Sequence, residues 1–230
     1  MDNLLIDNLS KSYGPKTILS HLQLRLPAHS CTVLLGKSGC GKTTFLRILA
    51  GLEQPDNGAI TYPENLKLGM MFQEARLFPW LTCRENIALG LAHQKDRKRV
   101  DELLALVQLE EAADKYPSQL SGGMQQRTAL ARTLAMDSDL ILMDEPFAAL
   151  DYFTRGQLQQ EMIHMQEKLH MGLILVTHNV DEALTLGSRI LILKEGTIAW
   201  DKTLSTPPSH RDLLSPDSIA MKRSILAALT

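Results

Sequence analysis

Gly36-Lys37-Ser38-Gly39-Cys40-Gly41-Lys42-Thr43 matches the pattern G-x-x-x-x-G-K-[ST] without a mismatch. This loop follows a short apolar run, residues 31–35, and precedes residues 42–50, whose apolar side chains recur at helical spacing. Glycines let backbone amides turn inward around phosphate oxygens, and the following helix directs the positive end of its dipole at the same anion. A chance match has a probability on the order of one percent in a chain this long. The sequence therefore predicts a strand, a phosphate-binding loop and a helix, in that order.

An apolar segment that ends in two carboxylates, Leu140-Ile141-Leu142-Met143-Asp144-Glu145, supplies the acidic groups that a phosphate-binding loop needs beside it. Lys42 can reach the β- and γ-phosphates of a nucleotide, and the Thr43 hydroxyl can bind Mg²⁺. Asp144 is predicted to hold the same ion, directly or through water, and Glu145 to orient and activate the attacking water. Two solvated carboxylates at a strand end are the alternative interpretation. Because the loop around Lys42 occurs in the same chain, the roles at Mg²⁺ and water are favoured over this alternative.

The composition is that of a globular protein: 230 residues, 44% hydrophobic and 22% charged, with a formal net charge of −2. Because no bulk charge attracts nucleic acid or anionic lipid, no nucleic-acid partner is predicted. Cys31, Cys40 and Cys83 form no CxxC pair, which argues against a zinc site or a disulfide framework and favours a reducing cytosol. The chain start lacks a signal-peptide core, and no apolar run approaches about 18 residues. Any membrane role is therefore expected to come through a partner.

Strands that alternate with helices predict an α/β fold with a largely parallel sheet. The predicted strands are residues 4–9, 18–26, 31–35, 68–72, 140–143, 173–177, 190–193 and 197–200, and the predicted helices are 42–50, 123–135, 153–169 and 180–186. The first two strands alternate as an antiparallel pair, and the last two form a hairpin. Pro55-Asp56-Asn57-Gly58 is typical of a turn. Residues 84–117 become helical and charged, which indicates a helical subdomain.

Leu120-Ser121-Gly122-Gly123-Met124-Gln125 resembles the signature of the ATP-binding-cassette (ABC) family, with Met124 where glutamine is commonest. A Ser-Gly-Gly turn at a helix N-terminus is a second anion-binding site, and one ATP does not need two such sites from one chain. The resemblance implies that two subunits pair head to tail. Each ATP would then lie between the loop around Lys42 of one subunit and Ser121 of the other.

The same resemblance implies the arrangement of the chain. A P-loop NTPase core, a mostly parallel sheet flanked by helices, is expected with an N-terminal antiparallel β-subdomain and an inserted α-helical subdomain. A single ABC ATPase domain would then span residues 1–230. Its expected parts are a RecA-like core plus β-subdomain at about 1–83 and 138–205, a helical subdomain at about 84–137 and a C-terminal tail at 206–230.

Further motifs occur in the order that the family implies. Tyr13 resembles the aromatic residue that stacks on adenine, Gln73 the glutamine that contacts Mg²⁺ and water, and His178 the histidine that hydrogen-bonds the γ-phosphate. Ala148-Ala149-Leu150-Asp151 resembles the D-loop, with alanine where serine is more frequent. Taken alone, a tyrosine near a strand end is usually packing, and a lone histidine usually has no special role. His178, however, follows a predicted strand at its carboxyl end, where the sites of α/β proteins lie.

These assignments give three sets of candidate residues. The nucleotide-binding set is Tyr13, Gly36, Lys37, Ser38, Gly39, Cys40, Gly41, Lys42, Thr43, Thr44, Ser121, Gly122 and Gly123. The catalytic set is Glu145, His178 and Gln73. The metal-binding set is Thr43, Gln73 and Asp144, so ATP and Mg²⁺ are the expected ligands.

The segment Glu74–Leu81 is predicted to dock transmembrane permease subunits, because Phe78, Trp80 and Leu81 suit an apolar groove. Their packing into the core of the helical subdomain is the alternative. Residues 78–82, 85–90 and 209–212 resemble those of importers for nitrate, sulfonate and taurine. Because every motif is intact, a homodimeric motor with two working sites is expected, and a pair with a different cassette remains open. The resemblance implies that this motor is peripheral on the cytoplasmic face of the inner (plasma) membrane. An extracytoplasmic solute-binding protein would be an indirect partner.

Four alternatives to this function remain open from the sequence. Related importers carry other small organics, such as thiamine precursors. Non-transport ABC proteins usually have two cassettes or coiled-coil insertions, and neither is evident in this sequence. A small-molecule kinase would not need Ser121-Gly122-Gly123 or His178. A non-catalytic nucleotide-binding regulator is disfavoured by the presence of Lys42, Glu145 and His178.

Cys40 lies in the phosphate-binding loop, at a helix N-terminus and beside Lys42. Such surroundings favour the thiolate, so thiol reagents are predicted to inactivate the protein and ATP to protect it. An inert residue that fills the loop is the alternative.

Overall fold

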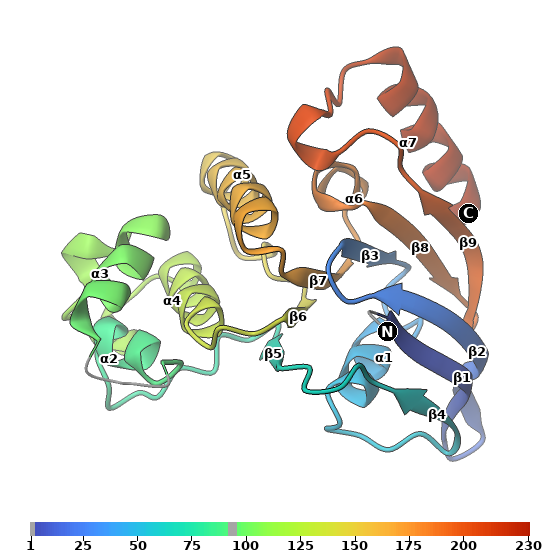
Figure 1. Cartoon of the computed structure of the whole chain (residues 1–230), viewed down its shortest axis with the longest axis horizontal. Coiled ribbons are helices and arrows are strands. Elements are labelled where there is room, and N and C mark those ends of the chain that lie inside the picture. Colours follow the sequence, from blue (N-terminus) through green and yellow to red (C-terminus); the bar gives the residue numbers. More distant parts are fainter. Residues whose placement is uncertain (1–2, 92–95) are drawn as a thin grey trace.

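A computed structural model describes residues 3–91 and 96–230 (Figure 1). Residues 1–2 and 92–95, which fall in the predicted β-subdomain and helical subdomain, lie outside this description. The central six-stranded sheet has the order β5-β6-β7-β3-β8-β9. Its strands are β3 (Cys31–Leu35), β5 (Leu68–Met71), β6 (Leu140–Asp144), β7 (Gly172–Thr177), β8 (Arg189–Lys194) and β9 (Thr197–Thr203). All neighbours from β5 to β8 pair in parallel and β9 is antiparallel, which confirms the predicted fold class.

A separate antiparallel sheet has the order β2-β1-β4, with strands β1 (Asn3–Tyr13), β2 (Lys16–Pro27) and β4 (Asn57–Thr61). The prediction that residues 55–58 form a turn was wrong for Asn57 and Gly58, which lie in β4. Gly58 has φ +86°, and a Cβ atom there would clash with the Asn8 carbonyl of β1. The glycine therefore permits close pairing beside an irregularity in β1, a use of glycine that resembles a turn signal in the sequence.

The helices are α1 (Lys42–Leu49), α2 (Cys83–Ala88), α3 (Arg97–Leu106), α4 (Gly122–Leu134), α5 (Tyr152–Leu169), α6 (Val180–Leu186) and α7 (Pro216–Leu229). Short 3₁₀ helices cover Glu110–Ala112, Pro117–Gln119 and Pro208–His210. Helices α2, α3 and α4 stand together beyond the β5 edge of the sheet, away from β1, β2 and β4 (Figure 1). They occupy the segment 84–137 for which the helical subdomain is predicted, except that α2 begins one residue earlier, at Cys83.

The central strands β3, β6, β7 and β8 are mostly apolar, as expected for a sheet that is covered on both faces. One face packs with residues of α4, α5 and α6. The other face packs with α1 and with inward-facing residues of β1 and β2. In β3 the alternation is direct, since Val33 and Leu35 belong to the first cluster and Leu34 to the second.

The register of the sheet determines which loops meet at its carboxyl edge. Leu35 of β3 is level with Thr177 of β7, and Asp144 of β6 is level with Val176 of β7. The loop after β3, the acidic pair at the end of β6 and the residues after β7 therefore begin side by side. Ligands of open α/β sheets bind at this edge.

Candidate functional site

A pocket of about 420 Å³ opens at this edge of the sheet. Its lining consists of Ile18, Ser38, Gly39, Gly41, Lys42, Thr43, Thr44, Gln73, Glu145 and His178. Lys42, Gln73, Glu145 and His178 come from separate segments of the chain, and the sequence analysis selected each of them. The structure thus gathers these candidates around one cavity.

The phosphate-binding loop is held in a conformation that glycine permits. Gly41 is the N-cap of α1 and has φ +108°, and a Cβ atom there would lie 2.9 Å from Cγ2 of Ile18. Lys42 is buried, and its Nζ atom donates to the Gly36 carbonyl at 2.9 Å and to the Lys37 carbonyl at 3.1 Å. The ammonium group therefore lies within the curve of the loop, where it can meet phosphate oxygens.

Asp144 ends β6 and is only 4% exposed. Burial raises the pKa of its carboxyl, while a hydrogen bond with Thr43 and the charge of Lys42 act in the opposite direction. The described residues contain no cluster of three or more His, Cys, Asp or Glu that could hold a metal. Mg²⁺ usually takes one or two carboxylates together with substrate phosphates and water, so the oxygens of Thr43, Gln73 and Asp144 fit this ion.

Glu145 has φ +48°, a left-handed conformation that is uncommon for a residue other than glycine. Its backbone N–H donates to the Val176 carbonyl at 2.9 Å, which ties the turn to β7. The turn brings the Glu145 carboxylate to His178, with 3.1 Å between Oε1 and Nδ1. Strained backbone of this kind is found at functional sites, and here it directs a carboxylate into the pocket.

The sequence profile described as ABC transporter matches residues 19–148. An aliphatic sulfonates import ATP-binding protein of Shouchella clausii is 42% identical over 204 residues, which is 89% of this chain and 82% of that protein. A probable sulfate/thiosulfate import ATP-binding protein of Chlorella vulgaris is 44% identical over 210 residues, covering 85% of this chain and 89% of that protein. The chain belongs to the ABC transporter ATPase family.

A solved dimeric ATP-binding cassette, bound to ADP and Pi, superposes on this ABC ATPase with a TM-score of 0.81. The two chains are 31% identical, and the match covers 88% of this chain and 99% of the other. These findings confirm the ABC resemblance, the P-loop fold class and the activity of an ATP hydrolase coupled to transport. Among the described residues, no helix is both long and apolar enough to cross a membrane.

The remaining candidates of the ABC ATPase lie outside the pocket lining. Tyr13 is half-exposed at the end of β1, and its hydroxyl donates to Glu53. That hydrogen bond is the main cause of a raised pKa for Tyr13, and Thr44 also lies within hydrogen-bond reach of the hydroxyl. The ring therefore stands beside the first turn of α1, close to the phosphate-binding loop.

The signature residues form a separate and exposed turn. Ser121 is the N-cap of α4 and accepts a hydrogen bond from the Met124 N–H at 3.3 Å. A Cβ atom at Gly122 would meet nothing within 4 Å, and one at Gly123 would lie 3.4 Å from the Ala149 carbonyl. None of the three lines the pocket around Lys42, and α4 lies well apart from α1 (Figure 1). The two anion-binding turns of one chain are therefore at different places on its surface.

The prediction of a Cys40 thiolate was wrong. Burial raises the pKa of the Cys40 thiol, although the charge of Lys42 and backbone N–H groups lower it. The reason is the direction of the side chain: Sγ lies so close to Gly36 that a Cβ atom there would be 2.5 Å from it. The sulfur also packs against the apolar cluster behind the loop. Proximity to Lys42 in sequence therefore does not outweigh desolvation.

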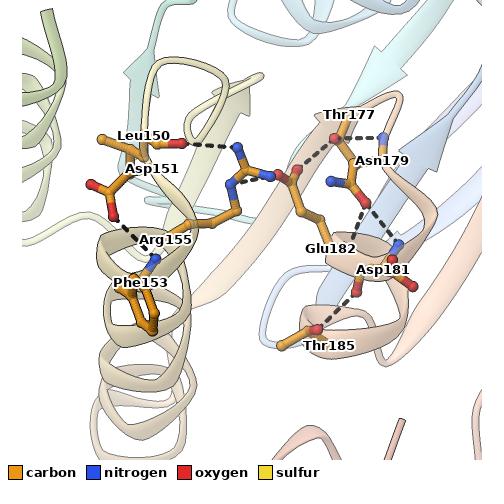
Figure 2. A network of polar contacts seen from close by, with 9 residues as sticks. All are labelled: Leu150, Asp151, Phe153, Arg155, Thr177, Asn179, Asp181, Glu182 and Thr185. Carbon is orange, nitrogen blue, oxygen red and sulfur yellow. Dashed lines mark hydrogen bonds and ion pairs between the residues drawn. The ribbon is translucent and has the colours of Figure 1, made fainter. Parts of the chain in front are cut away.

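Thr177, Arg155 and Glu182, to which the sequence assigned no role, are connected by polar contacts (Figure 2). Thr177 is the polar last residue of an otherwise apolar buried strand, and this was the signal that could have identified it. No comparable signal exists for Arg155 and Glu182. They belong to different helices, and only the fold brings them together.

Proposed function

We propose that this ABC ATPase is the ATP-hydrolysing motor of an importer, and that the pocket around Lys42 is its catalytic site. The convergence of Lys42, Gln73, Glu145 and His178 on one cavity supports this assignment. Hydrolysis of a nucleoside triphosphate requires charge neutralisation and a positioned water rather than covalent chemistry. The pocket offers a cation, a carboxylate and an imidazole for these tasks.

Each residue has a definite task in this proposal. The amides of residues 36–41 and the Lys42 ammonium neutralise the phosphates, and Thr43, Asp144 and Gln73 hold Mg²⁺. Mg²⁺ held by these residues would offset the negative charge of the phosphates. Glu145 accepts a proton from the attacking water, and His178, 3.1 Å from Glu145, hydrogen-bonds the γ-phosphate. Tyr13 stacks on the adenine beside α1.

The proposed working unit is a head-to-tail homodimer. The exposed turn of Ser121, Gly122 and Gly123 is absent from the chain's own pocket, which supports its use by a second copy. A similar solved cassette is a dimer with ADP and Pi bound. In this arrangement Ser121 of one subunit meets the γ-phosphate held by Lys42 of the other, so ATP joins the subunits and hydrolysis releases them.

The proposed docking surface for the permease is the segment Glu74–Leu81. Trp80 is 68% exposed and Phe78 is also exposed, with their rings packed edge to face at 5.4 Å between centroids. Large aromatic side chains in water are typical of protein interfaces, and this exposure argues against their burial in the core. The motor would then be peripheral on the cytoplasmic face of the inner membrane, with a solute-binding protein as an indirect partner.

For the cargo, we propose a small anionic solute of the sulfonate, nitrate or taurine class. Several similar proteins are aliphatic sulfonates import ATP-binding proteins, including one of Paraburkholderia xenovorans that is 46% identical over 211 residues. The cargo assignment is tested by uptake of labelled ethanesulfonate, nitrate and taurine in cells with and without the gene. Unchanged uptake of all three solutes would exclude this cargo class.

The experiment for the motor uses Glu145→Gln. The variant keeps the shape of the side chain but has no carboxylate to accept a proton, so kcat should fall by about 10²- to 10⁴-fold. Light scattering with size exclusion should show a dimer in saturating ATP, and the matched Lys42→Ala variant should stay monomeric. Full activity in Glu145→Gln would refute the role of Glu145, and a monomer at saturating ATP would favour the kinase interpretation.

The docking surface is tested separately with Trp80→Ala. Because Trp80 is exposed, the variant should keep basal ATPase activity and thermal stability close to wild type. It should lose co-purification with the membrane subunits and the ATPase stimulation that they cause. Retained co-purification would refute the docking assignment and leave the catalytic proposal intact.

A further inference from the structure

Polar side chains connect the loop before α5 to the loop that carries His178 (Figure 2). Arg155 of α5 donates from Nη2 to the Leu150 carbonyl at 2.9 Å. Its Nε atom faces the Glu182 carboxylate of α6, with 3.8 Å between Nε and Oε1. The other oxygen of Glu182 accepts a hydrogen bond from the Thr177 hydroxyl at 2.6 Å. We call this connection, Leu150-Arg155-Glu182-Thr177, the polar bridge.

The polar bridge holds both chain neighbours of His178. Thr177 donates to Glu182, and the Asn179 N–H donates to the Thr177 hydroxyl at 3.0 Å. Asn179 in turn caps α6 by accepting from the Asp181 N–H at 2.9 Å. The His178 side chain itself is 64% exposed and faces the pocket. The residues on either side of His178 are therefore held by hydrogen bonds, while its imidazole contacts Glu145 and is otherwise exposed to the pocket.

Glu182 is an unusual group to find at this place. Its side chain is only 6% exposed, and an isolated buried carboxylate is costly unless it is paired and hydrogen-bonded. The available partners are Thr177, which donates directly, and Arg155, which supplies the opposite charge. If this position served helix packing alone, an apolar residue would fill it without the free-energy cost of burying a carboxylate.

The contact between Arg155 and Glu182 is incomplete in this state. Arg155 Nε is buried and has no hydrogen-bond partner among residues 3–91 and 96–230, and its 3.8 Å separation from Glu182 Oε1 exceeds a hydrogen-bond distance. An approach of α5 toward α6 by about 1 Å would form a charge-assisted hydrogen bond. Since Arg155 also donates to the Leu150 carbonyl, such a movement of α5 would be coupled to a movement of the segment Ala148–Asp151.

We propose that Arg155 and Glu182 are positioning residues for His178, linking its placement to that of the segment Ala148–Asp151. This inference rests on the proposed role of His178 at the γ-phosphate. A Cβ atom at Gly123 would lie 3.4 Å from the Ala149 carbonyl, so this segment also contacts the signature turn that a second subunit is proposed to use. The polar bridge thus gives the subunit interface a direct route to a group in the pocket.

The test is a double-mutant cycle with Arg155→Met, Glu182→Gln and His178→Ala, measured by steady-state ATP hydrolysis over a range of ATP concentrations. Arg155→Met and Glu182→Gln should each lower kcat on the order of tenfold, because small misplacements of a catalytic group are costly. KM for ATP should stay within about twofold, since Lys42 and its loop are untouched. In the His178→Ala background neither substitution should lower the residual rate further.

Controls separate positioning from general stability. Arg189→Met breaks an ion pair of similar kind, with Asp201 on the β8–β9 hairpin, and should leave kcat unchanged. Arg155→Lys keeps the charge near Glu182 without the forked donors, and should recover part of the lost rate. If Arg155→Met does not fold, the double-mutant cycle is measured with His178→Ala and the nearly isosteric Glu182→Gln alone.

The outcomes distinguish this inference from the proposed function. Additive losses in the His178→Ala background, or wild-type kcat in Glu182→Gln, would overturn the positioning role and leave the catalytic proposal in place. Wild-type activity in His178→Ala would overturn both. A loss of kcat that vanishes in the His178→Ala background, with unchanged KM, would establish that the polar bridge positions His178.

Discussion

From the burial of Asp144 we predict that Asp144→Asn increases the stability of the nucleotide-free protein and decreases its ATPase activity. Asp144→Asn keeps the shape of the side chain and an acceptor for Thr43, but it removes the charge. The pKa of Asp144 is raised above its ordinary value of 3.8, mainly by burial. The folded protein therefore binds this proton more tightly than the unfolded chain, and its stability falls as pH rises from the ordinary pKa through the raised one.

Above the raised pKa the nucleotide-free wild type carries this penalty, and Asp144→Asn carries none at any pH. Removing such a feature from an active site stabilises by about 1 kcal/mol, which at this chain length raises Tm by about 2–4 °C. With Mg²⁺ and ATP at about 100 times Kd, the wild type gains about 2.7 kcal/mol. The variant lacks the proposed carboxylate ligand and gains less. The order of melting temperatures should therefore reverse when the nucleotide is added.

The assay is thermal unfolding from pH 5 to pH 8, first with a chelator and then with Mg²⁺ and ATP. The Tm advantage of Asp144→Asn without nucleotide should grow with pH, while its ATPase activity is lost. Asp114→Asn, a substitution of an exposed carboxylate, should stay within about 0.5 kcal/mol of wild type. An Asp144→Asn variant that melts below wild type without nucleotide, or an advantage independent of pH, would refute the reasoning.

Three further predictions concern local structure. Because burial raises the pKa of Cys40, alkylation of its thiol should be slow at pH 7 and faster toward pH 9. Bound ATP should slow this alkylation further. Mass spectrometry of the adducts measures the rates, with the buried Cys31 and Cys83 as internal references. Gly172→Ala would place a Cβ atom against the Ala28 carbonyl and 2.9 Å from Leu140 Cδ1, so it should destabilise by more than about 4 kcal/mol in denaturant unfolding. The matched Gly156→Ala in α5 meets nothing within 4 Å and should stabilise by about 0.5–1 kcal/mol. Thr82→Ala removes the capping box of α2 and should cost about 1 kcal/mol in the same experiment, whereas an unchanged midpoint would show that the cap contributes nothing.

The central sheet could be predicted from the sequence because its strands are buried on both faces and therefore read as continuous apolar runs. Residues 31–35 were predicted as a strand and form β3 with the same bounds. The helix after them was also predictable, since a phosphate-binding loop is defined by its residues rather than by distant partners. β4 escaped prediction because Gly58 permits a close approach between strands and resembles a turn residue.

The parts of the site that could not be predicted depend on where side chains point and on contacts between distant segments. Cys40 has a charged neighbour in sequence, but its sulfur turns under the loop toward Gly36. Glu182 lies within one turn of the predicted His178, yet its burial and its partner Arg155 follow from the packing of α5 beside α6. Neither the direction of the Cys40 side chain nor the burial of Glu182 can be inferred from composition or periodicity.

The pocket combines a buried, fixed side with an exposed one, and this asymmetry bears on how the motor works. Lys42 lines the pocket, is buried and donates hydrogen bonds to the loop, and Asp144, which precedes the lining residue Glu145, is buried too. The groups proposed to meet phosphate and metal are therefore held in place by the fold. His178 faces the same pocket but is largely open to solvent, and apart from the contact between its Nδ1 and Glu145 it is held through the residues on either side of it. Preorganised groups stabilise charge without reorganisation, whereas an open group takes its final position only when something covers it. A second subunit that covers this side would therefore control hydrolysis through His178 while leaving nucleotide binding to the buried side.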